Sequence, residues 1–148
     1  MNITWHIKTF DELKAIELYQ ILKIRAEVFI LEQNCNYLDI DDSDQKAWHI
    51  WAEHEGHIAA YCRTFPAGVK YPEASIGRVL TAQAYRQMAL GKALILKALL
   101  SIEINFKTIS VRISAQDYLL KFYSDLGFVD TGKKYLEDDI PHTEMIKL

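Results

Sequence analysis

Hydrophobic and polar positions recur along the chain with two periods, which separate predicted strands from predicted helices. Residues 3–7 alternate with a period of two, and this predicts a short strand. Residues 11–31 then place apolar side chains three and four positions apart, which predicts helical structure with Asp11 as its N-cap. The spacing is compatible with one helix or with two that separate near Ala26.

A polar loop and a β-hairpin are predicted next. Residues 34–46 are mostly polar and contain four aspartates. Residues 47–54 and 57–65 are strand-like, and the Glu55-Gly56 pair between them is typical of a tight turn. These features predict two antiparallel strands after the loop.

Strands and helices alternate in the second half of the chain. The predicted elements are a strand at 76–81, a helix at 92–106, a strand at 108–114, a helix at 117–126 and a final antiparallel pair from residue 128. A strand–helix–strand unit places its two strands parallel. The order therefore predicts one α/β domain over residues 1–148 with a mixed sheet.

Three side chains interrupt these patterns. Arg25 falls within an apolar stripe, so we expect it to be half-buried and paired with a carboxylate such as Glu32 or Asp39. Trp48 and Trp51 have opposite strand parity, so we expect one to face a helix and the other to face solvent or a partner.

Composition narrows the functional classes. The chain has 148 residues and a net charge of −3, which argues against a general nucleic-acid binder. No apolar run approaches the roughly 20 residues of a membrane helix. Cys35 and Cys62 lie outside any CxxC motif and no signal peptide precedes them, so a reduced, cytoplasmic protein is expected. The sequence leaves the oligomeric state open.

The sequence indicates no metal site. The hairpin histidines lack the spacing of metal ligands, and the loop aspartates lack the glycine and closing glutamate of a calcium loop. We interpret the aspartates as a solvated loop or as an acidic rim that attracts a cationic amine. The residues concerned are His49, His54, His57, Asp39, Asp41 and Asp44.

Residues 75–100 carry the first candidate chemistry. A strand runs into a loop with small residues and then into a helix, and helix N-termini bind anions through unpaired N–H groups and the helix dipole. The same pattern also fits an ordinary strand–helix unit without a ligand.

Three motifs add a family resemblance. Arg86-x-x-Ala89-x-Gly91 resembles the acyl-CoA signature of the GNAT-superfamily N-acetyltransferases, although Ala89 replaces a glycine. The segment 122–128, FYSDLGF, resembles the FYxxxGF segment of that superfamily, and Gln116 lies where the family usually has asparagine. Residues 25–44 and 137–145 resemble the ElaA-like subgroup, so the resemblance covers nearly the whole chain.

The resemblance implies a fold and a cosubstrate. The fold would be a mixed, mostly antiparallel sheet whose parallel fourth and fifth strands splay apart, with helices on both faces. The cosubstrate would be acetyl-CoA, without a metal, and the acceptor would be a primary amine on a small molecule or a peptide. The residues expected to hold the coenzyme are Val79, Leu80, Thr81, Arg86, Gln87, Met88, Ala89, Leu90, Gly91, Lys92 and Gln116. Ala89 is tolerated there if its φ is negative.

The resemblance also suggests catalytic roles. Tyr123 would protonate the departing thiolate, and transfer would be direct within a ternary complex. Neither cysteine has a recognisable histidine partner for a covalent route. The base remains open between Glu32, His142 and a water held by a loop aspartate. The alternative function is a GNAT-fold acyl-CoA-binding or protein-interaction module without turnover; a dinucleotide-binding domain is disfavoured because GxGxxG is absent.

Overall fold

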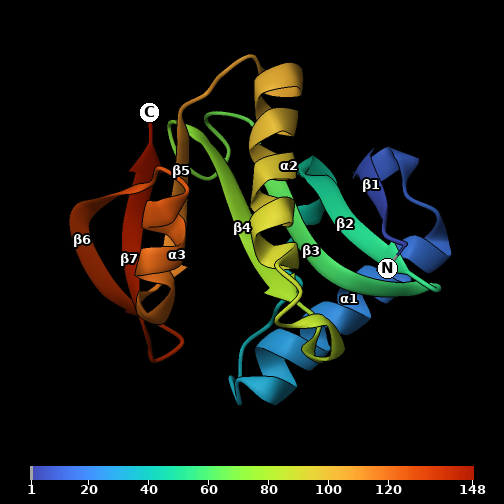
Figure 1. Ribbon diagram of the computed structural model, residues 1–148. Helices are drawn as coiled ribbons and strands as arrows, with labels where there is room; N and C mark the ends of the chain where they lie inside the picture. The colour runs from blue at the N-terminus through green and yellow to red at the C-terminus, as the bar shows by residue number, and fades with distance from the viewer. Residues whose placement is uncertain (1) are drawn as a thin grey trace.

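A seven-stranded mixed sheet forms the centre of the computed structural model, which describes residues 2–148 (Figure 1). The strand order is β1-β2-β3-β4-β5-β7-β6. Strands β4 and β5 pair in parallel, and every other neighbouring pair is antiparallel. This confirms the mixed, mostly antiparallel sheet and the GNAT-like element order.

The strands and helices occur in the predicted order, and most of their bounds lie close to the predicted ones. The strands are β1 (Thr4–Thr9), β2 (Trp48–His54), β3 (His57–Phe65), β4 (Ala74–Thr81), β5 (Val111–Gln116), β6 (Val129–Glu137) and β7 (Ile140–Lys147). The α-helices are α1 (Ala15–Arg25), α2 (Leu90–Phe106) and α3 (Leu120–Asp125). Strand β5 begins three residues later than predicted, because Ile109 lies outside the sheet and is 60% exposed.

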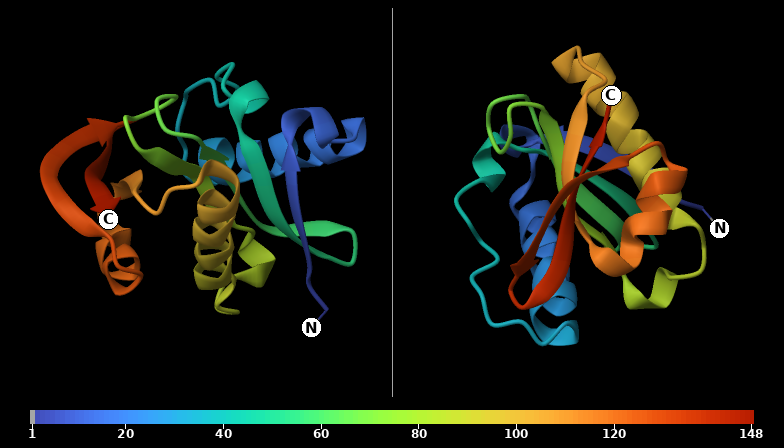
Figure 2. Two further views of the ribbon diagram at one scale, coloured as in Figure 1. Left: turned by 90° about the horizontal axis from the view of Figure 1, so that it is seen from above. Right: turned by 90° about the vertical axis from the view of Figure 1, so that its left-hand side faces the viewer.

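Helices cover both faces of the sheet. Helices α2 and α3 lie on one face and α1 on the other (Figures 1 and 2). The larger core joins α2 residues such as Leu94 to β2–β5 and β7, and the smaller core joins Ile21 of α1 to Trp51. The prediction that one tryptophan faces solvent or a partner is wrong: Trp48 packs edge-on against Phe106 of α2, with ring centroids 6.0 Å apart. Among residues 2–148, no helix has the length and apolar character needed to span a bilayer.

The first helical region changes type at the expected place. Helix α1 ends at Arg25 and continues directly into a π-helix, η2 (Ala26–Glu32). The Cys35 amide donates to the Ile30 carbonyl at 3.1 Å, five residues back, which continues the wide winding. The change near Ala26 is thus a change of winding within one continuous helix.

The predicted cap at Asp11 is wrong. A short 3₁₀ turn, η1 (Phe10–Glu12), precedes α1, and its capping residue is Thr9. The Glu12 side chain accepts the Thr9 amide at 2.9 Å, and the Glu17 side chain accepts the Lys14 amide at 2.8 Å. Each glutamate closes the turn that begins three residues earlier.

Strand β4 has a bulge on its β3 side and separates from β5 on the other. Tyr61 of β3 pairs with Leu80 while Arg63 pairs with Gly77, so β4 holds one residue more than β3 across this interval. Arg78 lies in the interval with a φ of 50°. Strands β4 and β5 pair only at Ala74–Val111 and Ser75–Arg112 and then diverge, as Figure 1 shows. This confirms the predicted splay of strands 4 and 5.

Candidate functional site

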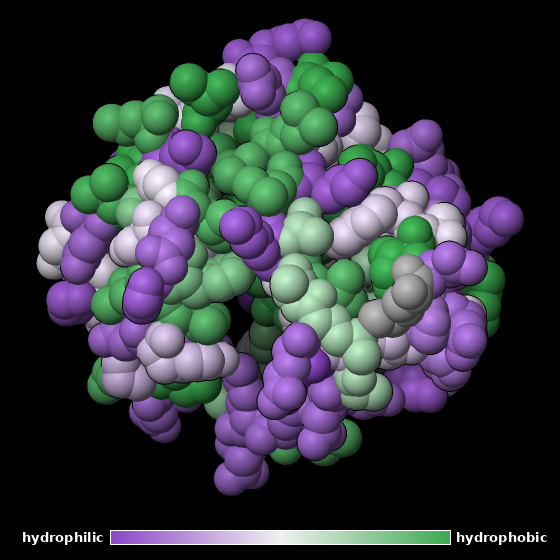
Figure 3. Space-filling view, in the orientation of Figure 1, coloured by the Kyte–Doolittle hydropathy of each residue, from purple (hydrophilic) through white to green (hydrophobic). Residues whose placement is uncertain are grey.

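The splay between β4 and β5 holds a cavity of about 870 Å³. In Figure 3 the surface is hollowed between the part over α3 and the part over the N-terminal end of α2. The cavity walls include Phe29 and Glu32 of η2, Arg63 of β3, Ser75–Thr81 of β4, Ile113–Gln116 of β5, Phe122 and Tyr123 of α3, and Glu137, Asp138, Ile140 and His142 around the last turn. A volume of this size suits a cofactor-sized ligand.

The N-terminus of α2 is open to an anion. Its N-cap is Ala89, whose side chain cannot accept a hydrogen bond, so none of the described side chains caps the Leu90, Gly91 and Lys92 amides. The expectation of a negative φ at Ala89 is wrong, because φ is 58° there and 74° at Gln87. A left-handed residue followed by helical ones turns successive N–H groups toward one point, which makes a concave anion site.

Gly91 leaves a slot between α2, β4 and α3. A Cβ at this position would lie 3.6 Å from Phe122 Cζ and 3.8 Å from Thr81 Oγ1. Both neighbours line the cavity, as do Val79 and Leu80 of the same strand. The glycine therefore gives a ligand close access to the helix N-terminus.

The predicted coenzyme residues divide into two groups. Val79, Leu80, Thr81, Arg86, Gly91 and Gln116 line the cavity, whereas the side chains of Gln87, Met88, Ala89, Leu90 and Lys92 do not. In the second group only Leu90 is buried. The loop can thus meet a ligand through its backbone rather than through these side chains.

Arg86 and Glu32 pair with each other. Arg86 Nη2 lies 2.5 Å from Glu32 Oε2, and Arg86 Nε donates to the Thr81 carbonyl at 3.1 Å. This contact links η2 to the loop before α2. A residue predicted to hold the coenzyme therefore neutralises a residue predicted as the base.

Tyr123 lines the cavity and has a hydroxyl without a partner among the described residues. It is 5% exposed, and its ring packs edge-on against Phe122 and Phe128 at centroid distances of 5.1 and 5.7 Å. The hydroxyl makes no hydrogen bond to any described residue, although Tyr123 lines the cavity. Burial raises the pKa of Tyr123, so the phenol stays protonated and can donate.

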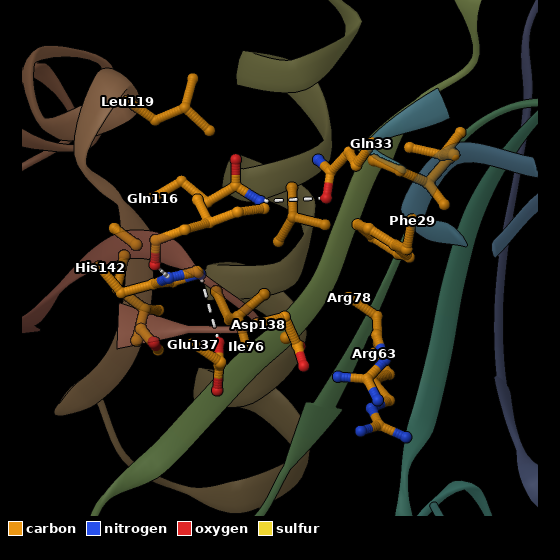
Figure 4. A pocket seen from close by; sticks show the side chains of 18 of the residues that line it. Phe29, Gln33, Arg63, Ile76, Arg78, Gln116, Leu119, Glu137, Asp138 and His142 are labelled. Carbon is orange, nitrogen blue, oxygen red and sulfur yellow. Dashed lines mark hydrogen bonds and ion pairs between the residues drawn. The ribbon is translucent and has the colours of Figure 1, made fainter. Parts of the chain in front are cut away.

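His142 lines the cavity from β7. Its Nδ1 is 2.7 Å from the Ile140 carbonyl and its Nε2 is 3.2 Å from Glu137 Oε2 (Figure 4). Beside it on β5, Gln116 reaches across the cavity, and its Nε2 lies 3.5 Å from Gln33 Oε1 on the segment that follows η2 (Figure 4). The structure thus brings Gln116, His142 and Glu32 to the walls of one cavity.

The loop aspartates are engaged by arginines that the sequence analysis did not single out as site residues. Arg25 is fully buried, and its guanidinium binds Asp39 at 2.8 Å and Asp44 at 2.6 Å. The interpretation of the aspartates as a solvated loop or an acidic rim is therefore wrong. The expected pairing of Arg25 with Asp39 is confirmed, whereas Glu32 pairs with Arg86 and Arg25 is fully rather than half-buried. Arg63 binds Asp41 and Asp44, and Arg78 binds Asp39 and Asp41. The sequence signals for this network were Arg25 within an apolar stripe and the four aspartates of residues 34–46.

The same network shifts the pKa of the aspartates. Burial by itself would raise the pKa of Asp41, but hydrogen bonds and attraction from Arg63 outweigh it and lower the pKa. Burial would likewise raise the pKa of Asp44, but the hydrogen bonds and attraction from Arg25 and Arg63 outweigh it and lower the pKa. Both carboxylates are therefore ionised at neutral pH and are already paired.

The hairpin histidines serve the fold. His49 is bonded to the Tyr61 hydroxyl at 2.7 Å and to the Asp44 carbonyl at 3.0 Å, and His54 to the Tyr85 hydroxyl at 2.9 Å. No cluster of three or more potential metal ligands occurs in the part of the chain that the structure describes. Cys35 and Cys62 are buried and free.

Known proteins share both the sequence and the fold. A family model described as an acetyltransferase (GNAT) domain matches residues 18–148. A UPF0039 protein of Synechocystis is 34% identical over 99% of this chain and 96% of its own length, and the protein ElaA of Escherichia coli is 33% identical over 98% and 96%. The crystal structure of an acyl-CoA N-acyltransferase from Pseudomonas aeruginosa superposes with a TM-score of 0.94 at 36% identity, covering 99% of this chain and all of that one.

Proposed function

Because the chain belongs to the GNAT acetyltransferase family, we propose that it transfers an acetyl group from acetyl-CoA to a primary amine within a ternary complex. The observation that carries the proposal is the cavity in the sheet splay. It joins the open N-terminus of α2 to the unpaired hydroxyl of Tyr123. One ligand with a phosphate end and a reactive end can occupy both places.

The coenzyme would bind along the splay. Its pyrophosphate would accept hydrogen bonds from the backbone N–H groups at residues 90–92, where the helix dipole favours negative charge. Its pantetheine arm would pair with the free edge of β4 at residues 79–81, where β5 has moved away. Arg86 lies in the chain between residues 79–81 and residues 90–92, and its guanidinium would exchange Glu32 for a phosphate oxygen of the coenzyme.

The chemical step needs one proton donor and one proton acceptor. The neutral amine attacks the thioester carbonyl, the C–S bond breaks, and the thiolate takes the Tyr123 phenolic proton. The new amide nitrogen then loses its extra proton, which restores the phenol of Tyr123. His142 would remove the proton of the incoming ammonium through Nε2 once the exposed Glu137 side chain turns away from that atom, because the Ile140 carbonyl holds the other ring nitrogen as a donor. Glu137 would stabilise the resulting imidazolium. Glu32 is the weaker candidate for the base, since Arg86 already offsets its charge.

A Tyr123→Phe variant tests the reaction. It should bind acetyl-CoA as the wild type does, because only one oxygen is lost, and its kcat should fall about 10²- to 10⁴-fold. Thiol release with an amine panel measures turnover, and thermal shift with coenzyme A, acetyl-CoA and NAD measures binding. Tyr19→Phe is the matched control, because Tyr19 is 68% exposed on α1.

The outcomes separate the candidate functions. Loss of turnover with retained binding supports the acid role, whereas unchanged kcat refutes it. Binding of acetyl-CoA by the wild type without turnover of any amine would indicate the binding module without catalysis. No stabilisation by either coenzyme A compound would refute the whole proposal.

A further inference from the structure

Three cations gather on one oxygen of one wall of the cavity. Asp41 Oδ2 lies 2.5 Å from Arg63 Nη2, 3.4 Å from Arg78 Nη2 and 3.6 Å from Lys70 Nζ. All four residues line the cavity. Lys70 Nζ has three donors, of which one goes to Ser43 Oγ at 2.7 Å, and it approaches Asp41 only to 3.6 Å, so this wall keeps capacity for a second anion.

The wider network leaves the same imbalance. Arg63 and Arg78 also bind Asp44 and Asp39, but Arg25 shares both of those aspartates. The network therefore sets four cations, Arg25, Arg63, Lys70 and Arg78, against the three carboxylates of Asp39, Asp41 and Asp44. One positive charge is left over in this ion-pair network, beside the cavity.

Two buried polar atoms on this wall have no partner. Arg63 Nε and Ser75 Oγ make no hydrogen bond to any described residue, and each residue is 2% exposed. Both residues line the cavity. A buried donor without a partner carries an unmet desolvation cost, which a ligand oxygen can remove.

The opposite wall has the opposite charge. Glu137 and Asp138 of the last turn line it together with His142, and Figure 4 shows them across the cavity from Arg63 and Arg78. Glu137 keeps a side-chain exposure of 55%. The cavity is therefore dipolar, with a basic wall at β3–β4 and an acidic wall at the β6–β7 turn.

We propose that the acceptor is a zwitterion whose carboxylate binds the Arg63–Lys70–Ser75 wall while its amine reaches the thioester from the acidic wall. This rests on the proposed acetyl transfer and names its substrate class. Gly77 pairs with Arg63, and the thioester would lie near Leu80, three residues further along β4, where the pantetheine arm is placed. The carboxylate subsite and the thioester are therefore no more than about 10 Å apart along β4, since the bulge in this strand shortens the path. That span suits an amino acid with a distal amine, or a short peptide, rather than a polyamine.

Three amines whose reacting nitrogen carries a chain of five saturated carbons test the inference. These are 6-aminohexanoate, pentylamine and cadaverine, whose far ends are negative, neutral and positive. A charge-assisted hydrogen bond to the carboxylate should give 6-aminohexanoate a kcat/KM about 10- to 100-fold above that of pentylamine. The kcat/KM of cadaverine should be lower than that of pentylamine, because its second ammonium would face the basic wall.

Two variants assign the effect to the basic wall. Lys70→Glu replaces a cation by an anion and should reverse the preference from 6-aminohexanoate to cadaverine, which a merely structural role of Lys70 would not do. Ser75→Ala should raise KM for 6-aminohexanoate by removing one hydroxyl from the wall. Lys23→Gln, a substitution at an exposed position of α1, is the control and should leave the kcat/KM values of the three amines in the same proportion as in the wild type.

The outcomes distinguish this inference from the proposed function. If the kcat/KM values of pentylamine and cadaverine equal that of 6-aminohexanoate, the zwitterion inference is wrong, but the proposed acetyl transfer is still supported. If Lys70→Glu leaves the preference unchanged, the wall has been misassigned. If no amine releases thiol and neither coenzyme stabilises the protein, the proposed function fails and the inference fails with it.

Discussion

Ala89 offers the sharpest test of the loop before α2. A residue with a Cβ at φ 58° is in the left-handed region, where the Cβ approaches the following carbonyl. That conformation costs about 1–2 kcal/mol for a residue other than glycine, asparagine or aspartate. Ala89→Gly should remove this cost.

The gain is partly offset in the unfolded chain. Glycine has more backbone freedom to lose on folding, which costs about 0.4–1 kcal/mol relative to alanine. The net expectation is a rise of about 0.5–1 kcal/mol in the free energy of unfolding. For a chain of 148 residues this corresponds to a Tm increase of about 2–3 °C.

A second alanine-to-glycine substitution, within α2 itself, should change the free energy of unfolding in the opposite direction. Ala93 lies four residues later in the body of α2, so Ala93→Gly should lower the free energy of unfolding by about 1 kcal/mol. Urea unfolding of both variants at pH 7 measures the difference. If Ala89→Gly destabilises the protein as much as Ala93→Gly does, the left-handed strain at Ala89 is not stored in the folded state.

Three further substitutions test the site and its supports. Gly91→Ala should fold with about 0.5–1 kcal/mol more stability but bind acetyl-CoA more weakly in titration calorimetry, because the new methyl enters the slot beside Phe122; equal affinity would contradict the assignment. His142→Gln should lower kcat/KM at pH 7 by about 10²-fold and less at pH 9–10, where more of the amine is neutral; a loss independent of pH would exclude the base role. Asp41→Asn should lower the free energy of unfolding by about 2–3 kcal/mol at pH 7. The folded-state pKa of Asp41 lies below the ordinary 3.8, so its contribution to stability is present above pH 3.8 and is lost as the pH falls through the folded-state pKa. The stability of Asp41→Asn should therefore depend less on pH in acid unfolding than that of the wild type. Asp42→Asn is the control and should not show this change.

Local sequence was sufficient for the elements and their order. The hairpin turn at Glu55-Gly56, the end of α2 at Phe106 and the helix stop at Gly127 were all predictable, because periodicity and turn residues act over a few positions. The motif positions also predicted that Gly91, Gln116 and Tyr123 would share a site, and all three line one cavity.

The sequence by itself thus determined which strands and helices form and where the motif residues would meet. The position of Arg25 in an apolar stripe already indicated a carboxylate partner such as Asp39. Only the tertiary structure decided the partners of Arg63 and Arg78, because Asp39 meets Arg78 at a separation of 39 residues, through the path of a loop that has no periodicity. The same holds for the Arg86–Glu32 pair and for the bulge at Arg78, which depend on strand register. Periodicity reports that a side chain is buried, whereas its partner depends on which segments the fold brings alongside it.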